Sequence, residues 1–227
     1  WGRDAERFVA ILRNKNDREN WRGEYWGKWY TAAALAYACG PTAEHLAQLK
    51  ENARDVVKTQ DADGYIGPYA VAERLQVWDI WCRKYVELGL ITAYDLTSDK
   101  TFLDAACRNA DNLIDDLAKR KLRVIDVGVS VLKGTANSSI IEPMALLYQR
   151  TGEAKYLQFA QSILASWNTP SAFAPEGIHL LDDALANKPP LKNHAYSIMS
   201  CFEGVCELYR GTGDRKYLDA AVRFGQS

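Results

Sequence analysis

The chain has 227 residues, enough for one domain, and its 48% hydrophobic and 25% charged residues are those of an ordinary globular protein. Its formal net charge of −1 gives no electrostatic attraction to nucleic acid or to an anionic membrane, so neither partner is expected. No apolar run approaches the roughly 20 residues of a membrane span, and the N-terminal residues do not resemble a signal peptide.

Residues 23–38 are predicted to form a buried helix, because the segment is apolar on nearly all sides. Its few charges lie near its start, where Glu24 and Lys28 stand four residues apart among tryptophans that include Trp29. That spacing suits a surface ion pair as well as a polar pair inside a site. Glu24 and Trp29 are therefore candidate binding residues.

Residues 60–71 predict a turn-rich loop between helices. Its start, Asp61-Ala-Asp63-Gly64, resembles a calcium-binding loop, but Ala72 occupies the twelfth position, where such loops have a bidentate glutamate. Calcium binding is therefore not expected.

A second buried helix is predicted over residues 76–95. Near its start stand Trp78, Asp79, Trp81 and Arg83. Asp79 and Arg83 either contact a ligand or form an internal ion-pair ladder with Glu87, because these residues recur every four positions. Tryptophans are more often core residues than ligand platforms, and the two at this helix start are kept as candidate platforms.

A bend pattern recurs at a period of about 55 to 60 residues, in the range of stacked or ring-closed helical repeats. The copies begin at Tyr94, Tyr148 and Tyr209, with a degenerate copy at Tyr37. Gly152 and Gly213 can end one helix in a left-handed conformation, and Thr97, Ser98 and Thr151 can cap the next. Each copy predicts a helical hairpin whose second helix is amphipathic.

The second half of the chain repeats this order after a break. Residues 124–131 alternate in polarity, which predicts a strand. A third buried helix follows over residues 138–149, capped by Ser138 or Ser139. Glu142 lies in its first turn, where the carboxylate either faces a site or only interacts favourably with the positive N-terminal end of the helix dipole.

A proline-rich loop over residues 168–192 leads into a fourth buried helix over residues 193–210. His194 stands at the start of this helix, in the same repeat register as Asp79, so the two are expected at one rim. The histidine is either a ligand contact or a structural residue.

Cysteine and histidine usage predicts no metal site in this chain. The five cysteines are odd in number and form no Cys-x-x-Cys pair, which favours free buried thiols over a disulfide framework: Cys39, Cys82, Cys107, Cys201 and Cys206. The three histidines share no ligand spacing.

Alternating buried and amphipathic helices predict an all-α fold, an (α/α) toroid of helical hairpins. A closed ring of six hairpins takes on the order of 340 residues at this period. We therefore expect residues 1–227 to be a partial (α/α)6 barrel, truncated at its C-terminal side. Its open edge favours self-association through exposed apolar helix faces.

Aromatic platforms with a few carboxylates, an arginine and a histidine suit a sugar, whose C–H faces stack on rings and whose hydroxyls need fixed partners. The candidate substrate-binding residues are Glu24, Trp29, Trp78, Asp79, Trp81, Arg83, Glu142 and His194.

Five segments, in order along the chain, resemble the β-L-arabinofuranosidase-like glycoside hydrolases, family 127 and its relatives. They are Trp21-Arg-Gly-Glu-Tyr-Trp-Gly-Lys-Trp29, Gln60-Asp-Ala-Asp-Gly-Tyr-Ile-Gly67, Trp78-Asp-Ile-Trp-Cys-Arg-Lys-Tyr85, Ile141-Glu-Pro-Met-Ala-Leu-Leu-Tyr148 and His194-Ala-Tyr196. Glu24, Glu142 and His194 match family positions best. The resemblance implies an (α/α)6 barrel that removes L-arabinofuranose or related sugars from plant glycans or glycoproteins with retention. The compartment stays open, with the bacterial cytoplasm or periplasm expected.

The same resemblance implies a zinc-held cysteine nucleophile with a separate glutamate acid/base. Those groups lie in a Glu-x-Cys motif and later cysteines that this chain lacks, since Glu203-Gly-Val-Cys206 has a different spacing. The catalytic residues are thus expected downstream, and the chain alone is expected to be inactive. Trp78 stands where characterised relatives tend to have a substrate-contacting histidine, so the sugar need not be arabinofuranose.

Two other functions stay open on the residues. Another (α/α)-barrel carbohydrate enzyme, an unsaturated uronyl hydrolase or a sugar epimerase, would need its acid/base pair within these helices, so alanine at Asp79 or His194 would abolish turnover. A non-catalytic helical-repeat module would bind a glycan or protein without a catalytic half.

Overall fold

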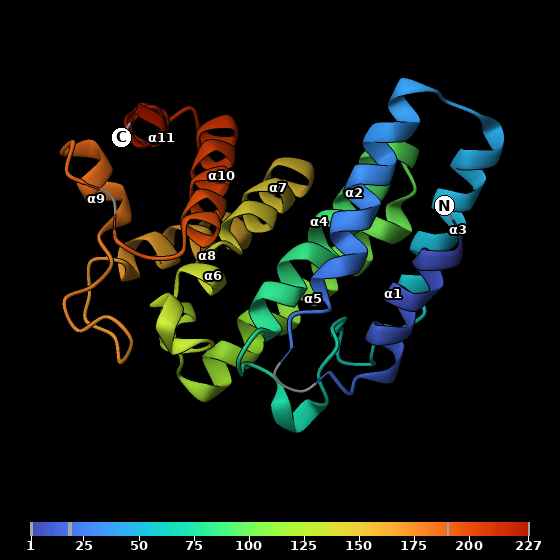
Figure 1. Ribbon diagram of the computed structural model, residues 1–227, viewed down its shortest axis with the longest axis horizontal. Coiled ribbons are helices and arrows are strands. Elements are labelled where there is room, and N and C mark those ends of the chain that lie inside the picture. Colours follow the sequence, from blue (N-terminus) through green and yellow to red (C-terminus); the bar gives the residue numbers. More distant parts are fainter. Residues whose placement is uncertain (1, 18–19, 190, 227) are drawn as a thin grey trace. The chain divides into compact units, whose positions relative to one another are not determined.

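The computed structural model describes residues 2–17, 20–189 and 191–226, and these residues form α-helices and short 3-10 turns without a strand (Figure 1). The all-α prediction is therefore confirmed. The chain divides into two compact units, Trp1–Asp116 and Leu117–Ser227. Among the described residues, no helix is long and apolar enough to cross a membrane.

The first unit is built around one buried helix. Its elements are α1 (Gly2–Asn14), α2 (Glu24–Cys39), α3 (Ala43–Val57), the 3-10 turn η1 (Val71–Glu73), α4 (Asp79–Thr97) and α5 (Lys100–Arg120), which runs past the unit boundary. α4 is buried along most of its length, and α2 and α3 pack against it. Figure 1 shows α2 lying alongside α4. This is the inner helix that the apolar run of residues 76–95 predicts.

Two glycines allow α2 and α4 to approach closely. A Cβ atom at Gly27 of α2 would lie 1.8 Å from the backbone oxygen of Tyr85 on α4. A Cβ atom at Gly89 of α4 would lie 2.4 Å from the Trp26 ring of α2. Both distances are far below van der Waals contact, so only glycine fits at either position.

The second unit repeats the hairpin order. Its elements are η2 (Val124–Asp126), η3 (Ser130–Leu132), α6 (Thr135–Ser138), α7 (Ile141–Thr151), α8 (Ala154–Ser166), α9 (Leu180–Leu185), α10 (Ala195–Thr212) and α11 (Arg215–Gln226). α7 packs against α8 and α10, and α11 packs against α9 and α10. α10 buries much of its length, whereas α11 buries only Tyr217 and Ala220. The predicted alternation of inner and outer helices is confirmed within this unit.

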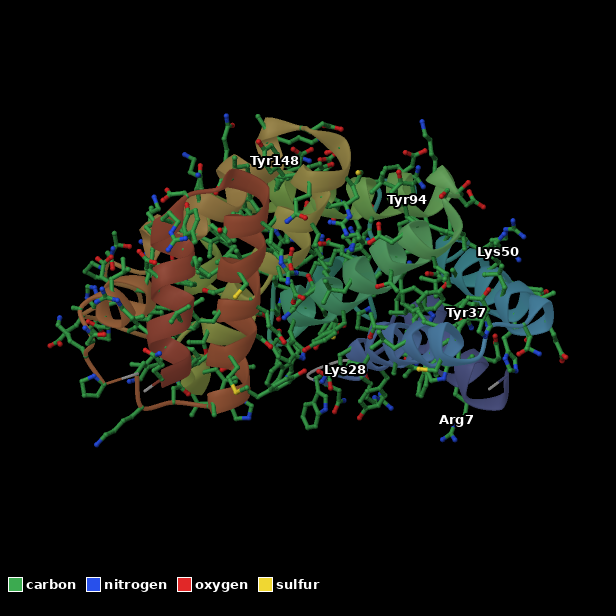
Figure 2. The ribbon with its side chains drawn as sticks, turned by 90° about the horizontal axis from the view of Figure 1, so that it is seen from above. Arg7, Lys28, Tyr37, Lys50, Tyr94 and Tyr148 are labelled. Carbon is green, nitrogen blue, oxygen red and sulfur yellow. The ribbon has the colours of Figure 1, made fainter. Side chains whose placement is uncertain are left out.

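The bends have the predicted left-handed helix ends, but Thr97 and Thr151 do not cap the next helices. They are the last residues of α4 and α7, and their hydroxyls accept the N–H groups of Asp99 and Glu153, ahead of α5 and α8. At Ser98, Gly152 and Gly213 the backbone is left-handed, with φ of 55°, 74° and 72°. Each of these residues donates its N–H to the carbonyl of the bend tyrosine four positions earlier. Two of these tyrosines, Tyr94 and Tyr148, are labelled in Figure 2. Ser98 thus ends its helix in the way glycine does elsewhere, which its expected capping role did not predict. The degenerate bend after Tyr37 has a different geometry, with φ of −154° at Gly40.

Two further local predictions are wrong. Residues 124–131 form the turns η2 and η3 in place of a strand. Val124, Ile125 and Val127 are buried without a neighbouring strand to pair with among the described residues, whereas Val131 is 73% exposed, and Asn137 Nδ2 donates to the Val127 carbonyl at 2.8 Å. Neither Ser138 nor Ser139 caps α7. Ser138 Oγ accepts from Trp167 Nε1 at 3.0 Å, and Ser139 Oγ donates to the Ala136 carbonyl at 2.6 Å.

Candidate functional site

The first helical turn of α2 faces α4 through a polar contact. One carboxylate oxygen of Glu24 accepts the indole N–H of Trp81, and the other lies 2.8 Å from the ammonium of Lys28. The Glu24 side chain is 10% exposed and that of Lys28 is 34% exposed. Glu24 is thus held in place by two donors at a partly open position, and its pairing with Lys28 is not that of a solvated surface pair.

Four aromatic rings form a strip beside this contact. Trp21 and Trp78 have ring centroids 5.7 Å apart, Trp78 and Trp81 6.1 Å, and Trp81 and Tyr85 5.1 Å, all in edge-to-face arrangement. Trp21 is 46% exposed, and Trp78 is partly exposed. We call Glu24, Lys28 and these four rings the aromatic wall.

Lysines sit over the deeper end of the aromatic wall. Lys28 Nζ lies 4.7 Å from the Tyr85 ring centroid (Lys28 is labelled in Figure 2), and Lys84 Nζ lies 5.3 Å from the same centroid. Lys84 is fully buried. Sequence analysis missed Tyr85 and Lys84, although Tyr85 is one helical turn after Trp81 and therefore on the same face.

Asp79 and Arg83 lie beneath the wall, fully buried. Arg83 Nε donates to Asp79 Oδ2 at 3.2 Å, and Arg83 Nη1 donates to Asn112 Oδ1 of α5 at 2.8 Å. Tyr65 donates its hydroxyl to Asp79 Oδ1 at 2.8 Å. These contacts favour the internal ion-pair alternative for Asp79 and Arg83, because neither side chain reaches solvent.

Burial changes the acid–base properties of this layer. Burial first, and then the neighbouring Asp79 carboxylate, raise the pKa of the Tyr65 hydroxyl well above its ordinary value. Burial also raises the pKa of Glu87 well above its ordinary value, and the Arg83 charge opposes that shift. Asn109 donates to Glu87 Oε1 at 3.2 Å. Tyr65 hence serves as a hydrogen-bond donor to Asp79. Glu87, the third residue of the predicted ion-pair ladder, tends toward its neutral form.

Trp29 lies apart from the aromatic wall. Its ring is 6.5 Å from that of Phe8 on α1, and it lines a hollow of about 170 Å³ with residues of α1 and α3. One residue along a helix turns the side chain by about 100°, so Trp29 cannot share the face of Lys28. The structure does not bring Trp29 together with Trp78 and Trp81.

In the second unit, Glu142 and His194 occupy the starts of two packed helices. Glu142 lies in the first turn of α7, half-buried, and a Cβ atom at Gly204 of α10 would lie 2.8 Å from its backbone nitrogen. His194 is exposed at the N-cap of α10, where its Nδ1 accepts the N–H of Ser197 at 3.4 Å. In the neutral ring the proton then lies on Nε2, which remains available as a donor.

The described residues contain no group of three or more His, Cys, Asp or Glu side chains that could hold a metal ion. All five cysteines are free thiols, as expected, but only Cys82 and Cys201 are buried, whereas Cys107 and Cys206 are half-buried and Cys39 is exposed.

Comparison with known protein families decides between the alternatives. A family model described as β-L-arabinofuranosidase, GH127 catalytic domain, matches residues 4–227. The chain belongs to this family. The resemblance carried by the five sequence segments is thereby confirmed, and membership disfavours both the other barrel enzymes and a non-catalytic repeat module.

Solved structures share the fold of this chain. The family 127 chain is similar to a β-L-arabinofuranosidase from Geobacillus stearothermophilus T6, with a TM-score of 0.65 and 16% identity over 96% of this chain and 38% of that one. It is also similar to a GH127 β-arabinofuranosidase (TM-score 0.62, 18% identity, 96% and 36% covered). A third structure, described as a glycoside hydrolase, gives 0.58 at 20% identity, with 95% and 33% covered.

The chain spans about a third of the length of these structures, and at such identities the likeness shows the fold alone. No curated protein matches its sequence.

Proposed function

We propose that this chain forms part of the catalytic barrel of a family 127 glycoside hydrolase that acts on L-arabinofuranose-type or related sugars of plant glycans. Family membership over residues 4–227 supports the reaction class. The observation that carries the site is the fixed Glu24 carboxylate, held by Trp81 and Lys28 beside partly exposed indole rings. This arrangement offers both an apolar platform and a hydroxyl acceptor.

The residues of the aromatic wall would divide the work of binding a sugar. The exposed rings of Trp78 and Trp21 offer surfaces for sugar C–H groups. Glu24 would accept from a hydroxyl and Lys28 would donate to one. Within the second unit, considered separately, the same reasoning makes His194 a donor through Nε2 and Glu142 an acceptor. Asp79 and Arg83, which are fully buried, would support the aromatic wall from below without contacting the sugar.

We assign the nucleophile, the acid/base and any zinc ion to parts of the longer protein outside this chain. Support comes from the missing Glu-x-Cys motif and from the absence of a ligand set among the described residues. We accordingly propose that the isolated chain does not turn over substrate.

Exposed apolar surface supports our proposal that the chain is part of an (α/α)6 barrel. Met199 on α10 is 56% exposed, beside a hollow of about 490 Å³ that Ile198 and Phe224 also line. In the first unit, Leu35 on α2 is 72% exposed. Further helices of a longer protein would cover these faces, and the chain alone would self-associate through them. Light scattering after size exclusion would show a monomer if this is wrong.

Hydrolysis of p-nitrophenyl β-L-arabinofuranoside by the full polypeptide tests the function. Replacing Glu24 with Gln removes the charged acceptor, and we expect kcat/KM to fall by about 10-fold or more, as for loss of a hydrogen bond to a charged group. Glu44→Gln is the matched control, because Glu44 is exposed on α3, where its carboxylate accepts a hydrogen bond from Gln48 at 3.3 Å. Equal activity of both variants would remove Glu24 from the sugar site.

Trp78 bears on the identity of the sugar. If the tryptophan has remodelled the pocket, Trp78→His should change the preference between arabinofuranoside and a second glycoside such as p-nitrophenyl β-L-arabinopyranoside. A variant with unchanged preference would place Trp78 outside the pocket.

A further inference from the structure

The turn that precedes Trp78 is strained. Leu75 has φ of 65° and Val77 has φ of 43°, both in the left-handed region. For a β-branched residue this conformation is a rare outlier, and strain of this kind persists only where surrounding contacts over-determine the backbone. Such turns cluster at functional sites. This turn leads directly into a ring of the aromatic wall.

Asp79 holds the turn from its C-terminal side. Its Oδ2 accepts the backbone N–H of Leu75 at 2.9 Å, and its own backbone N–H donates to the Gln76 carbonyl at 3.0 Å. The same carboxylate accepts from Arg83 and from the Tyr65 hydroxyl. With Asp79 fully buried, all of these bonds lie in a low-dielectric environment, where they are strong.

Tyr65 supports both the carboxylate and the Trp78 ring. Its hydroxyl donates to Asp79 Oδ1 at 2.8 Å and accepts the Tyr69 N–H at 3.0 Å. Tyr65, Tyr69 and Cys82 form a buried cluster on which Trp78 packs. The Tyr65 hydroxyl therefore links the buried cluster on which Trp78 packs to the Asp79 carboxylate, which holds the turn.

Two guanidinium groups fix the Tyr65 ring in turn. Arg74 lies 3.9 Å and Arg83 4.4 Å from its centroid. Arg74 is buried and pairs with Asp61 at 2.7 Å and Asp63 at 2.5 Å. In the loop over residues 60–71, whose start resembles a calcium-binding loop, the carboxylates of Asp61 and Asp63 thus pair with the Arg74 guanidinium.

We propose that Tyr65 and Asp79 are positioning residues for the sugar site: they hold the left-handed turn at Leu75–Val77 so that Trp78 stands as a fixed platform. The proposal rests on the proposed function, because it assumes that Trp78 faces a sugar. Neither residue touches the ligand. The Tyr65 hydroxyl transmits its effect through the turn.

The test compares Tyr65→Phe with Tyr30→Phe in the full polypeptide labelled with 5-fluorotryptophan. Both changes remove one buried hydroxyl, but that of Tyr30 donates to the Leu49 carbonyl at 3.3 Å, away from the turn. The ¹⁹F signal of Trp78 is identified by its loss in Trp78→Phe. We expect it to shift or broaden in Tyr65→Phe and to stay unchanged in Tyr30→Phe. An unshifted, sharp Trp78 signal in folded Tyr65→Phe overturns the proposal.

Kinetics with p-nitrophenyl β-L-arabinofuranoside give the second readout. Tyr65→Phe should raise KM by about 3- to 10-fold with kcat unchanged within about twofold, because a displaced platform weakens binding without touching the reacting atoms. Unchanged KM despite a moved Trp78 signal would refute the link to the site.

A rescue variant separates positioning from general stability. Glycine at Val77 adopts the left-handed conformation without strain, so Tyr65→Phe/Val77→Gly should recover the wild-type Trp78 signal and KM. If Tyr65→Phe alone does not fold, the double variant is used to test the proposal. Failure of the double variant to recover the wild-type Trp78 ¹⁹F signal would then contradict it. Absence of arabinofuranoside hydrolysis in the wild type would sink the proposed function, while the ¹⁹F comparison, which needs no sugar, would still decide whether Tyr65 holds Trp78.

Discussion

The three left-handed bends allow a quantitative test of how the helical hairpins are stabilised. Gly152 and Gly213 have φ of 74° and 72°, and a Cβ atom at either would meet nothing within 4 Å. Alanine there pays the left-handed cost of about 1–2 kcal/mol and no steric cost. It also restricts the unfolded chain, which returns about 0.4–1 kcal/mol. Each Gly→Ala variant should therefore lose about 0.5–1 kcal/mol.

Ser98→Gly tests the same reasoning with the opposite sign. Serine at φ of 55° already pays the left-handed cost, so glycine should gain about 0.5–1 kcal/mol. Gly225→Ala is the matched control, since Gly225 lies within α11 in open space without positive φ, and alanine there should stabilise by up to about 1 kcal/mol.

Urea unfolding followed by circular dichroism at 222 nm measures these differences as shifts in the midpoint at constant slope. The reasoning is refuted if Gly152→Ala and Gly225→Ala change stability in the same direction, or if Ser98→Gly destabilises.

Three further predictions depend on which groups are buried. Burial raises the pKa of Glu87, so its contribution to the free energy of unfolding is complete below about pH 4.5 and is lost as pH rises through the raised value, by up to about 1.4 kcal/mol per pH unit. Glu87→Gln should therefore flatten the pH dependence of the urea midpoint above about pH 4.5. Gly27→Ala places a methyl group on the Tyr85 backbone oxygen and should cost about 3 kcal/mol or more, or prevent folding, whereas a thermal midpoint within 2 °C of wild type would contradict the close approach. Cys39 is exposed and should react with a thiol reagent in the native state, while Cys82, whose pKa burial raises, should react only on unfolding; equal rates would show the burial to be wrong.

The hairpins could be predicted because their signals are local. A tyrosine, a threonine and a glycine within five residues decide where one helix ends, and the bends at Tyr148 and Tyr209 follow that rule. The alternating polarity of residues 124–131 is also a local signal, but the strand predicted from it is wrong. A strand needs a neighbouring strand to pair with, and no local pattern specifies that partner.

The candidate site depends on contacts that sequence spacing does not determine. Glu24 and Trp81 are far apart in the chain, and their hydrogen bond arises only where α2 meets α4. A spacing of four residues describes both the partly open Glu24–Lys28 pair and the fully buried Asp79–Arg83 pair. Burial separates the two cases, and burial depends on packing.

The glycine contacts between α2 and α4 have a consequence for ligand affinity. Glu24 comes from one helix and Trp81 from the other, so a sugar that uses both would ordinarily lose affinity to the work of bringing two elements together. Here the backbone of Gly27 lies against that of Tyr85, and the Trp26 ring packs against Gly89. The distance between α2 and α4 is therefore fixed before a ligand binds. Little conformational entropy remains to be lost when a ligand arrives. A larger residue at Gly89, which touches no ligand, should therefore weaken binding by spreading the two halves of the wall.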